Sequence, residues 1–309
     1  MVIMNYELAI VGSGAAGFTG AIYAKRAGIK TVVIDKGIGG GLANVSPKIE
    51  NFPGFESISG MELMEKMKKH ASNYADFRFN EEITEINKIN DSFKISTNKE
   101  TYNVKAIILC TGTEYRKLNV TGEKELTGKG VSYCATCDGF FFKDKKVAVI
   151  GGGNSALIES IYLKQIGCKE VYVIHRRDQL RAEKAYQDEA IEKGVKLIFN
   201  TKLESINGDQ KIEYLTLNDV KTDKKSKFFV DGLFISIGEV PQNDLAKQLG
   251  VKLDEKGFIV TDRQLRTNIK GVYAAGDITG GLRQVITACA EGAIAALSST
   301  ESLGKKYPY

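Results

Sequence analysis

One pattern constrains the fold of this 309-residue chain more than any other, because it occurs twice: a short apolar run, a glycine-rich turn, a helix-like stretch and a second apolar run. The first copy occupies residues 6–34 and the second residues 146–174. Short apolar runs that flank a glycine turn and a helical stretch are typical of two parallel strands joined by a helix. The sequence therefore predicts an α/β fold with two Rossmann-like, three-layer domains.

The segment near the end of the chain predicts how the two domains are connected. Residues 271–277 have the pattern of one more buried strand, and a long apolar helix follows through residue 297. This stretch is too short to form a third domain. We therefore expect it to return and complete the first domain, so that the second domain is inserted in the first. The expected boundaries are residues 1–116 and 245–309 for the first domain and residues 117–244 for the second.

The first glycine turn has the sequence GSGAAG and runs from Gly12 to Gly17. Between a strand and a helix, these glycines allow a tight turn, a close approach of backbone to a pyrophosphate, and close packing of the helix on the strand. The helix N-terminus then faces the phosphates. Asp35 follows the second strand, where a carboxylate can accept a hydrogen bond from a ribose hydroxyl. The pattern favours a dinucleotide site over a turn that serves packing alone.

The second glycine turn, Gly151-Gly152-Gly153, is followed by basic residues instead of an acid. The end of its second strand carries His175, Arg176 and Arg177, and Arg181 comes shortly after. A carboxylate would repel a ribose 2′-phosphate, whereas guanidinium groups bind it through charge-assisted hydrogen bonds. The sequence therefore favours NADPH over NADH as the ligand. The alternative is a solvated basic start to the following helix.

A pair of cysteines stands between the two glycine turns. Cys134 and Cys137 form a CxxC motif, and Asp138 follows directly. Such a pair can close a small disulfide ring, and one thiol can lower the pKa of the other. Half of a zinc site is the alternative, but the other three cysteines are isolated, so we expect redox chemistry and no metal. Asp138 is the candidate acid and base for the thiols, with a capping role as its alternative.

Composition limits the partners of the chain. Its net charge of +5 comes from 43 basic and 38 acidic residues, and the densest basic run, residues 221–227, lacks interleaved aromatics. We interpret that run as a solvated hairpin turn and expect no nucleic-acid partner. No apolar stretch is long enough for a spanning helix, and the first residues lead straight into a strand pattern. We therefore expect no membrane partner and a cytoplasmic location, which the irregular cysteine spacing also favours.

Taken together, the motifs resemble those of low-molecular-weight thioredoxin reductase. The resemblance rests on the segment CATCDG, which begins at Cys134, on the run HRR with Arg181 downstream, and on Gly276-Asp277 with Arg283-Gln284 in the last part of the chain. It covers nearly the whole sequence. It implies NADPH as electron donor, FAD as cofactor, thioredoxin or a thioredoxin-like protein as acceptor, and a homodimer. It also implies that Cys137 lies against the flavin and that Cys134 attacks the disulfide of the partner.

Motif and resemblance together define two sets of expected cofactor-binding residues. The expected FAD site comprises Gly12, Ser13, Gly14, Ala15, Ala16, Gly17, Asp35, Lys36, Gly41, Leu42, Asn51, Thr111, Gly112, Gly276, Asp277, Arg283, Gln284 and Val285. The expected NADPH site comprises Gly151, Gly153, Asn154, Ser155, Ala156, His175, Arg176, Arg177 and Arg181.

Three departures from the family pattern leave alternatives open. Asn154 stands where an acid is usual, only Glu159 remains of a usual pair of glutamates, and the loop Gly39-Gly40-Gly41 has glycine where many members carry glutamine. One alternative is therefore a thioredoxin reductase-like flavoenzyme that takes electrons from reduced ferredoxin or a deazaflavin. Another is a non-catalytic redox sensor, whose disulfide is reduced once without turnover.

Overall fold

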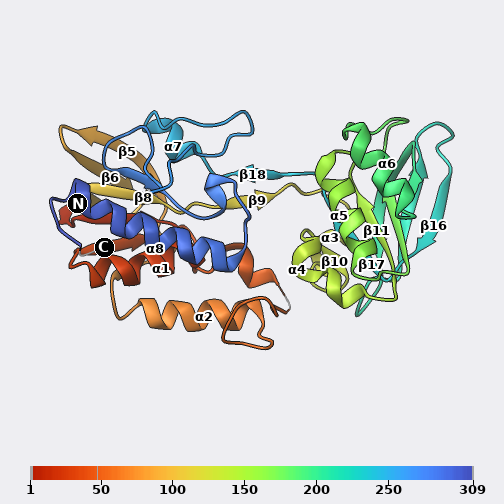
Figure 1. The fold of residues 1–309 in the computed structure, drawn as a ribbon, viewed down its shortest axis with the longest axis horizontal. Coiled ribbons are helices and arrows are strands. Elements are labelled where there is room, and N and C mark those ends of the chain that lie inside the picture. The colour runs from red at the N-terminus through yellow and green to blue at the C-terminus, as the bar shows by residue number, and fades with distance from the viewer. Residues whose placement is uncertain (1–2, 47, 308–309) are drawn as a thin grey trace. The chain divides into compact units, whose positions relative to one another are not determined.

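The computed structural model describes residues 3–46 and 48–307, and the chain divides into two compact units. The terminal unit consists of Met1–Glu114 and Val240–Tyr309, and the inserted unit of Tyr115–Glu239. The chain passes from one unit to the other within the strands β9 (Thr113–Tyr115) and β18 (Glu239–Pro241), which form a two-stranded sheet (Figure 1). The inserted unit therefore interrupts the terminal unit in sequence.

A five-stranded parallel sheet in the order β19-β8-β2-β3-β4 forms the centre of the terminal unit. The central strands are buried along their whole length, as expected for a parallel sheet that is covered on both faces. The strands are β2 (Leu8–Val11), β3 (Thr31–Ile34), β4 (Asp76–Arg78), β8 (Ala106–Leu109) and β19 (Val272–Ala274).

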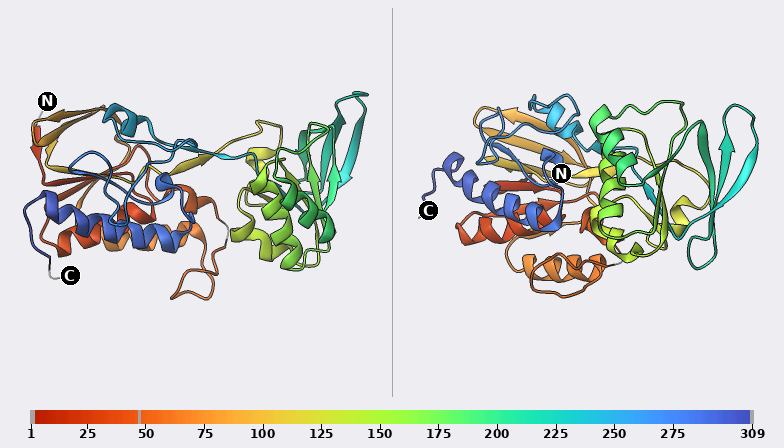
Figure 2. Two further views of the ribbon diagram at one scale, coloured as in Figure 1. Left: turned by 45° about the horizontal axis from the view of Figure 1, so that its top comes forward. Right: turned by 45° about the vertical axis from the view of Figure 1, so that its right-hand side comes forward.

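Alternation along β2 divides the core of this unit into two layers. Leu8 and Ile10 pack in one apolar cluster with the helices, and Ala9 and Val11 pack in another with a second sheet. The helices are α1 (Ala15–Arg26), α2 (Gly60–Ala71) and α8 (Val285–Ser302), and α1 and α8 lie side by side in Figures 1 and 2. The second sheet has the order β1 (Ile3–Asn5), β7 (Thr101–Val104), β6 (Ser92–Thr97) and β5 (Ile83–Ile89), and α7 (Asp244–Gln248) packs with it.

The inserted unit repeats this three-layer plan. Its parallel sheet has the order β10-β17-β11-β12-β13. Val147 and Val149 pack in the apolar cluster of the helices, whereas Ala148 and Ile150 face an antiparallel sheet β14-β15-β16; Figure 2 shows the two covering layers. The strands are β10 (Val131–Ser132), β11 (Lys146–Ile150), β12 (Glu170–Ile174), β13 (Lys196–Ile198), β14 (Thr201–Asn207), β15 (Tyr214–Asp219), β16 (Lys225–Phe229) and β17 (Gly232–Ile235), and the main helices are α5 (Asn154–Gln165) and α6 (Lys184–Glu192).

Short helical segments complete both units: η1 (Gly41–Val45) and η3 (Asp277–Thr279) in the terminal unit, and α3 (Glu123–Leu126), α4 (Ala135–Asp138) and η2 (Gly139–Phe142) in the inserted unit. The predicted α/β fold class with two Rossmann-like domains is confirmed.

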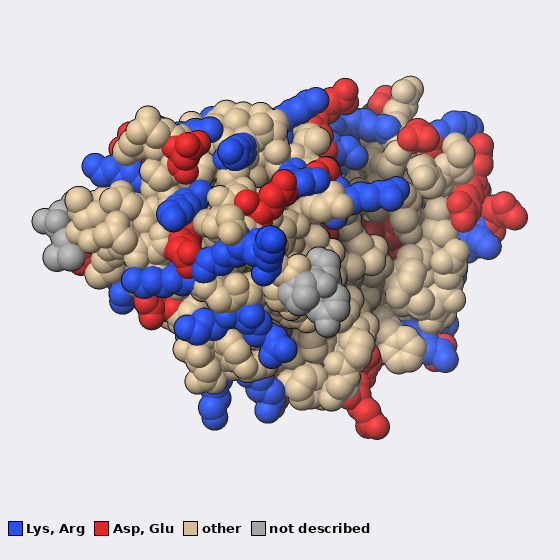
Figure 3. All heavy atoms as spheres, turned by 60° about the vertical axis from the view of Figure 1, so that its left-hand side comes forward, with Lys and Arg blue, Asp and Glu red and all other residues tan. Residues whose placement is uncertain are grey.

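Surface features agree with the composition. Residues 221–227 are exposed and include the turn between the antiparallel strands β15 and β16, as predicted. Basic and acidic side chains are intermixed on the face that Figure 3 shows. In the described part of the chain, no helix combines the length and apolar character needed to cross a membrane.

Candidate dinucleotide and disulfide sites

In the first glycine turn, the three glycines have different surroundings. A Cβ on Gly12, whose φ is +97°, would overlap the carbonyl of Cys110, and a Cβ on Gly17 would overlap the carbonyl of Gly12. These two glycines are therefore required for the packing of α1 on β2 and β8. Gly14, the N-cap of α1, is different, because a Cβ there would meet no atom within 4 Å and no described side chain caps the helix. Open space thus lies in front of a free helix N-terminus, where a phosphate can bind.

Asp35 links the loop after β3 to this turn. Its Oδ2 accepts hydrogen bonds of 2.7 Å from the backbone N–H and the hydroxyl of Ser13, and its Oδ1 accepts one from the N–H of Gly37 at 2.7 Å. Each carboxylate oxygen can accept more than one hydrogen bond, so capacity for a ribose hydroxyl remains. The Ser13 side chain is fully buried and directed to Asp35, so it supports the acid instead of presenting a hydroxyl to a ligand.

The glycine loop after β3 comes close to the first turn. Gly39, Gly40 and Gly41 all have positive φ, which favours glycine, and the N–H of Gly40 donates to the Ser13 carbonyl at 2.8 Å. A Cβ on Gly41 would lie 3.7 Å from the Cα of Gly14. The φ of +60° at Gly41 lies in the left-handed region, which favours glycine at this position.

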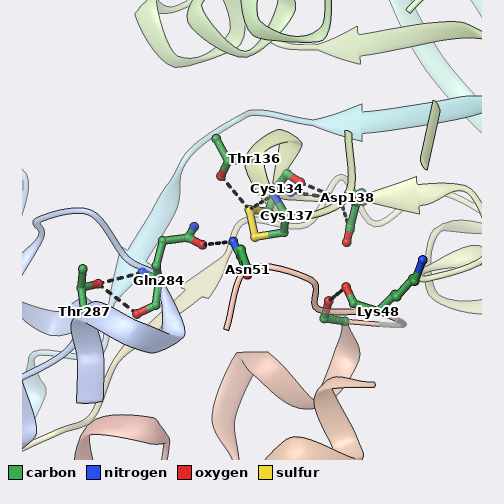
Figure 4. The surroundings of a disulfide bond; sticks show 10 residues. Lys48, Asn51, Cys134, Thr136, Cys137, Asp138, Gln284 and Thr287 are labelled. Carbon is green, nitrogen blue, oxygen red and sulfur yellow. Dashed lines mark hydrogen bonds between the residues drawn. A yellow bond between two sulfur atoms is a disulfide. The ribbon is translucent and has the colours of Figure 1, made fainter. Parts of the chain in front are cut away.

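Two further expected FAD segments meet at the start of α8. The Asn51 side-chain amide donates to Oε1 of Gln284 at 3.0 Å, and Gln284 forms a capping box with Thr287 (Figure 4). A Cβ on Gly276 would lie 3.1 Å from the Cβ of Ala16 in α1, so the Gly276-Asp277 turn packs on the first fingerprint. Arg283, which directly precedes Gln284, has a left-handed φ of +50°.

The remaining expected FAD residues differ in their surroundings. Ala15 and Ala16 are buried in α1, and Val285 packs against the same apolar cluster. The Thr111 hydroxyl donates to the Gln242 carbonyl at 2.7 Å, beside Gly112. Lys36 is exposed and forms an ion pair of 3.3 Å with Glu114, and Leu42 lies half-buried in η1.

Glu291, which was not among the residues expected from the sequence, organises the turn at Gly276. Its Oε2 accepts hydrogen bonds from the Gly276 N–H at 2.7 Å and from the Thr279 hydroxyl at 3.1 Å. The available signal was the one charged residue in the stretch 285–300, directly before Gly292, where a Cβ would overlap the Ala16 carbonyl.

The second glycine turn shows the same division of roles. A Cβ on Gly151 would crowd Ala156 and the Ser236 carbonyl, and a Cβ on Gly152 would overlap the ring of His175. Gly153 is the N-cap of α5, and a Cβ there would meet nothing within 4 Å; no described side chain caps this helix. The buried Ala156 therefore acts in packing, whereas the open position next to Gly153 resembles that at Gly14.

The basic residues after β12 are placed in two different ways. His175 is only 7% exposed, and its Nδ1 donates to the Gly151 carbonyl at 2.9 Å, so the ring supports the turn from below. Burial lowers the pKa of His175 below its ordinary value, which favours the neutral ring near pH 7. Arg176, Arg177 and Arg181 are exposed, and no ion pair joins them to a carboxylate among the described residues. Their guanidinium groups are accessible to an anion.

The two cysteines of the CxxC motif form a disulfide with a Cα–Cα distance of 5.3 Å. Cys134 is the N-cap of α4, and its Sγ accepts hydrogen bonds from the Cys137 N–H at 3.2 Å and from the Thr136 hydroxyl at 3.3 Å (Figure 4). A sulfur at a helix N-terminus that accepts such bonds is better stabilised as a thiolate. Among the described residues, no group of three or more His, Cys, Asp or Glu side chains could hold a metal ion.

Asp138 lies close to this disulfide in an asymmetric environment. Its Oδ2 accepts a hydrogen bond of 2.6 Å from the hydroxyl of Ser132, which in turn accepts one from the Cys134 N–H at 3.1 Å. Its Oδ1 is buried and has no hydrogen-bond partner among the described residues. Burial raises the pKa of Asp138 above its ordinary value, although the Ser132 hydrogen bond acts in the opposite direction. A carboxyl group with a raised pKa is thus linked to the backbone of Cys134 through the Ser132 hydroxyl.

Two glycine turns with open helix N-termini and a CxxC disulfide are features of a nucleotide-linked disulfide oxidoreductase, and comparison with known proteins agrees. The family model "pyridine nucleotide-disulphide oxidoreductase" matches residues 6–292. The chain therefore belongs to the pyridine nucleotide-disulphide oxidoreductase family. Membership implies the use of a flavin and a pyridine nucleotide.

Within this family, the similar proteins are thioredoxin reductases. The chain is 43% identical to thioredoxin reductase of Treponema pallidum over 94% of this chain and 95% of that protein, and 41% identical to that of Bacillus subtilis over 95% and 93%. Among solved structures, thioredoxin reductase of Streptococcus pyogenes has a TM-score of 0.93 at 39% identity, over 97% of this chain and 98% of that chain. The predicted relationship to thioredoxin reductases is confirmed.

Proposed function

We propose that the chain is an NADPH-dependent thioredoxin-disulfide reductase. Electrons pass from NADPH through FAD to the Cys134–Cys137 disulfide, and from the resulting dithiol to thioredoxin or a thioredoxin-like protein. The observation that carries this proposal is the Cys134–Cys137 disulfide with the carboxyl group of Asp138 beside it, in a chain that also has two dinucleotide turns. Relatives named thioredoxin reductase over nearly the whole chain support the choice of acceptor.

For the cofactors, we assign FAD to the domain of residues 1–116 and 245–309, and NADPH to the domain of residues 117–244. The open space at Gly14 fits the FAD pyrophosphate, with Asp35 for the ribose and the segments at Asn51 and Gly276 around the flavin. Bound there, FAD supplies two-electron transfer between a nicotinamide and a disulfide.

The inserted unit fits NADPH by the same reasoning. The space at Gly153 receives the pyrophosphate at the N-terminus of α5. The exposed guanidinium groups of Arg176, Arg177 and Arg181 bind the 2′-phosphate, and His175 acts through the shape of the turn. These accessible arginine side chains favour NADPH over a ferredoxin or deazaflavin as the electron donor.

The protein's own groups perform the sulfur chemistry. Reduction by two electrons breaks the Cys134–Cys137 bond, and the thiolate of Cys134 then attacks one sulfur of the acceptor disulfide, so that a mixed disulfide forms and the other acceptor sulfur leaves. Cys137 attacks the Cys134 sulfur, which restores the internal disulfide and releases the reduced acceptor. Asp138 gives and takes the protons of these steps. In sum, NADPH, one proton and a protein disulfide yield NADP⁺ and a protein dithiol.

We further infer a cytoplasmic homodimer that takes neither nucleic acid nor membrane as partner. The absence of a secreted disulfide pattern among five cysteines supports the compartment. Size-exclusion chromatography with light scattering tests the oligomeric state.

The deciding experiment is anaerobic. NADPH should bleach the flavin absorbance of the purified protein, and oxidised thioredoxin should restore it through many turnovers. Cys134→Ser and Cys137→Ser should each still be bleached by NADPH but lose protein-disulfide reduction by on the order of 10³-fold or more, because each removes one of the two exchanging sulfurs. Cys168→Ala, in the same unit but outside the motif, is the matched control.

Each alternative gives a different result. A protein that bleaches once and recovers without further turnover is a redox sensor. Bleaching by reduced ferredoxin but not by NADPH assigns the other donor. Retained disulfide turnover in either serine variant contradicts the proposed role of the pair.

A further inference from the structure

The side chain of Asn154 makes a reciprocal pair of hydrogen bonds. Its Nδ2 donates to Oε1 of Glu183 at 2.7 Å, and its Oδ1 accepts from the Glu183 backbone N–H at 2.8 Å. Both ends of one amide are therefore used by one residue, 29 positions further along the chain. A carboxylate at position 154 could accept from the N–H but could not donate to Glu183. An amide at position 154 is therefore the group that fits this contact.

The same contact holds a short segment against the second glycine turn. The backbone N–H groups of Arg181 and Ala182 both donate to the Gly152 carbonyl, at 2.7 and 3.2 Å. Residues 181–183, here called the strap, are thus attached to the turn at Gly152 and to the first residue of α5 at Asn154. The Ala182 side chain is buried, whereas Arg181 is exposed. The backbone of Arg181 is fixed and its guanidinium group is accessible.

We propose that Asn154 is a positioning residue for nucleotide specificity: its paired hydrogen bonds with Glu183 hold the strap so that Arg181 meets the ribose 2′-phosphate of NADP(H) on the second turn. This inference rests on the proposed function, because it takes NADP(H) as the ligand of the inserted unit. It predicts that Asn154 acts on the 2′-phosphate alone. Loss of the Asn154 hydrogen bonds should therefore weaken NADP(H) binding through Arg181 and should leave the affinity for NAD(H) unchanged.

Isothermal titration of NADP⁺ and of NAD⁺ into the purified flavoprotein tests this without measuring turnover. Asn154→Ala removes both hydrogen bonds without adding a charge, so NADP⁺ should bind roughly tenfold more weakly, while the affinity for NAD⁺ should change less than about twofold. In an Arg181→Ala background, the same substitution should have no further effect on NADP⁺. Ile158→Ala, an exposed apolar position one turn along α5, is the matched control.

A double substitution that exchanges the amide and the carboxylate of this pair keeps its net charge and gives an independent check. Asn154→Asp alone places two carboxylates against each other and should weaken NADP⁺ binding, whereas Asn154→Asp with Glu183→Gln restores one donor and one acceptor and should recover most of the affinity.

The outcomes separate this inference from the proposed function. If the wild-type protein does not prefer NADP⁺ to NAD⁺, the donor assignment fails and this inference fails with it. If it prefers NADP⁺ but Asn154→Ala leaves that preference unchanged, weakens both nucleotides equally, or adds its full effect to Arg181→Ala, only the inference is overturned. Failure of the exchanged pair to recover affinity also counts against it.

Discussion

At the scale of single residues, the disulfide site depends on how the two oxygens of Asp138 differ. Oδ2 accepts the Ser132 hydroxyl at 2.6 Å, whereas Oδ1 is buried without a partner among the described residues. An unpartnered, buried carboxylate oxygen costs free energy when ionised and costs less when the group is protonated. The site therefore favours a carboxyl group that keeps its proton at higher pH than an exposed aspartate.

Ser132→Ala should shift the pH dependence of the thiol–disulfide step. Burial raises the pKa of Asp138 and the Ser132 hydrogen bond lowers it, so loss of the hydroxyl should raise that pKa further. If Asp138 acts as the acid, the rate falls as pH rises through its pKa, and this decline should move to higher pH in the variant. Stopped-flow reoxidation of the reduced protein by oxidised thioredoxin, measured across pH, shows the shift. Ser132→Thr, which keeps a hydroxyl, should behave like the wild type.

Asp138→Asn is the companion variant. It should slow the same step roughly 100-fold and remove the decline with pH altogether. The raised pKa also means that Asp138 stabilises the fold most below its ordinary value of 3.8, and that this contribution is lost as pH rises through the raised pKa. The free energy of unfolding of Asp138→Asn should therefore depend less on pH over that interval. An unchanged rate profile would rule out the acid–base role.

The sequence points to the proposed reacting residues more directly than to the residues that surround them. Cys134, Cys137 and Asp138 stand in one motif, and their spacing alone indicates the chemistry. Ser132 belongs to strand β10 and its role depends on which way its hydroxyl points, which no motif records. Glu291 acts on a turn fifteen residues earlier in the chain, so its role depends on the packing of α8.

At the scale of elements, the two strand–turn–helix units use their glycines alike. In each turn the first glycine allows close packing, and the glycine at the helix N-cap, Gly14 or Gly153, has open space in front of it. The sequence pattern predicted both turns because their function requires glycine at fixed positions. For the first turn it also predicted different roles for the three glycines, whereas the atoms that each glycine packs against depend on neighbouring strands and could not be predicted from the sequence.

A matched pair of alanine substitutions in the second turn should separate these two roles. Gly152→Ala places a methyl group in the ring of the buried His175 and should destabilise the fold by about 1–3 kcal/mol. Gly153 has a φ of −102° and open space, so Gly153→Ala should change stability by less than about 0.5 kcal/mol but weaken NADP⁺ binding roughly tenfold, because the methyl group occupies the phosphate position. Thermal unfolding and titration calorimetry measure the two effects. Equal destabilisation by both substitutions would contradict the assignment of Gly152 to packing and of Gly153 to nucleotide binding.

His175 illustrates what element geometry adds to a motif. Sequence analysis grouped it with Arg176, Arg177 and Arg181 as a ligand of the 2′-phosphate. In β12, however, Val171 and Val173 face the helix layer, and alternation continues this side to His175, which lies under Gly152. The period of two was visible in the sequence and places His175 on the side of Val171 and Val173. It does not distinguish His175 from Arg177, which has the same parity and lies beyond the end of β12.

At the scale of the whole molecule, the five cysteines divide into one reactive pair and three interior thiols. Cys110 and Cys168 are buried, and Cys289 is half-buried. Burial raises the pKa of all three, to about 11 for Cys168. In the sequence these three cysteines are isolated from one another, and in the structure two of them are buried. We therefore expect thiolate reactivity at Cys134 and Cys137 once their disulfide is reduced.

Counting reactive thiols tests this distribution and the route of electrons together. Denatured, oxidised protein should react with iodoacetamide at three cysteines, and fully reduced, denatured protein at five. In the native state near pH 8, the oxidised protein should label only slowly, because its free thiols are buried or half-buried and have raised pKa values. Brief reduction should add rapid labelling at Cys134 and Cys137 only. NADPH should be as effective as a phosphine reductant if the bound flavin connects the nucleotide to the disulfide. Peptide mass spectrometry locates the label. Rapid modification of Cys110, Cys168 or Cys289 would contradict the expected restriction of reactivity to Cys134 and Cys137. Labelling after phosphine but not after NADPH would contradict electron transfer from the nucleotide to the disulfide.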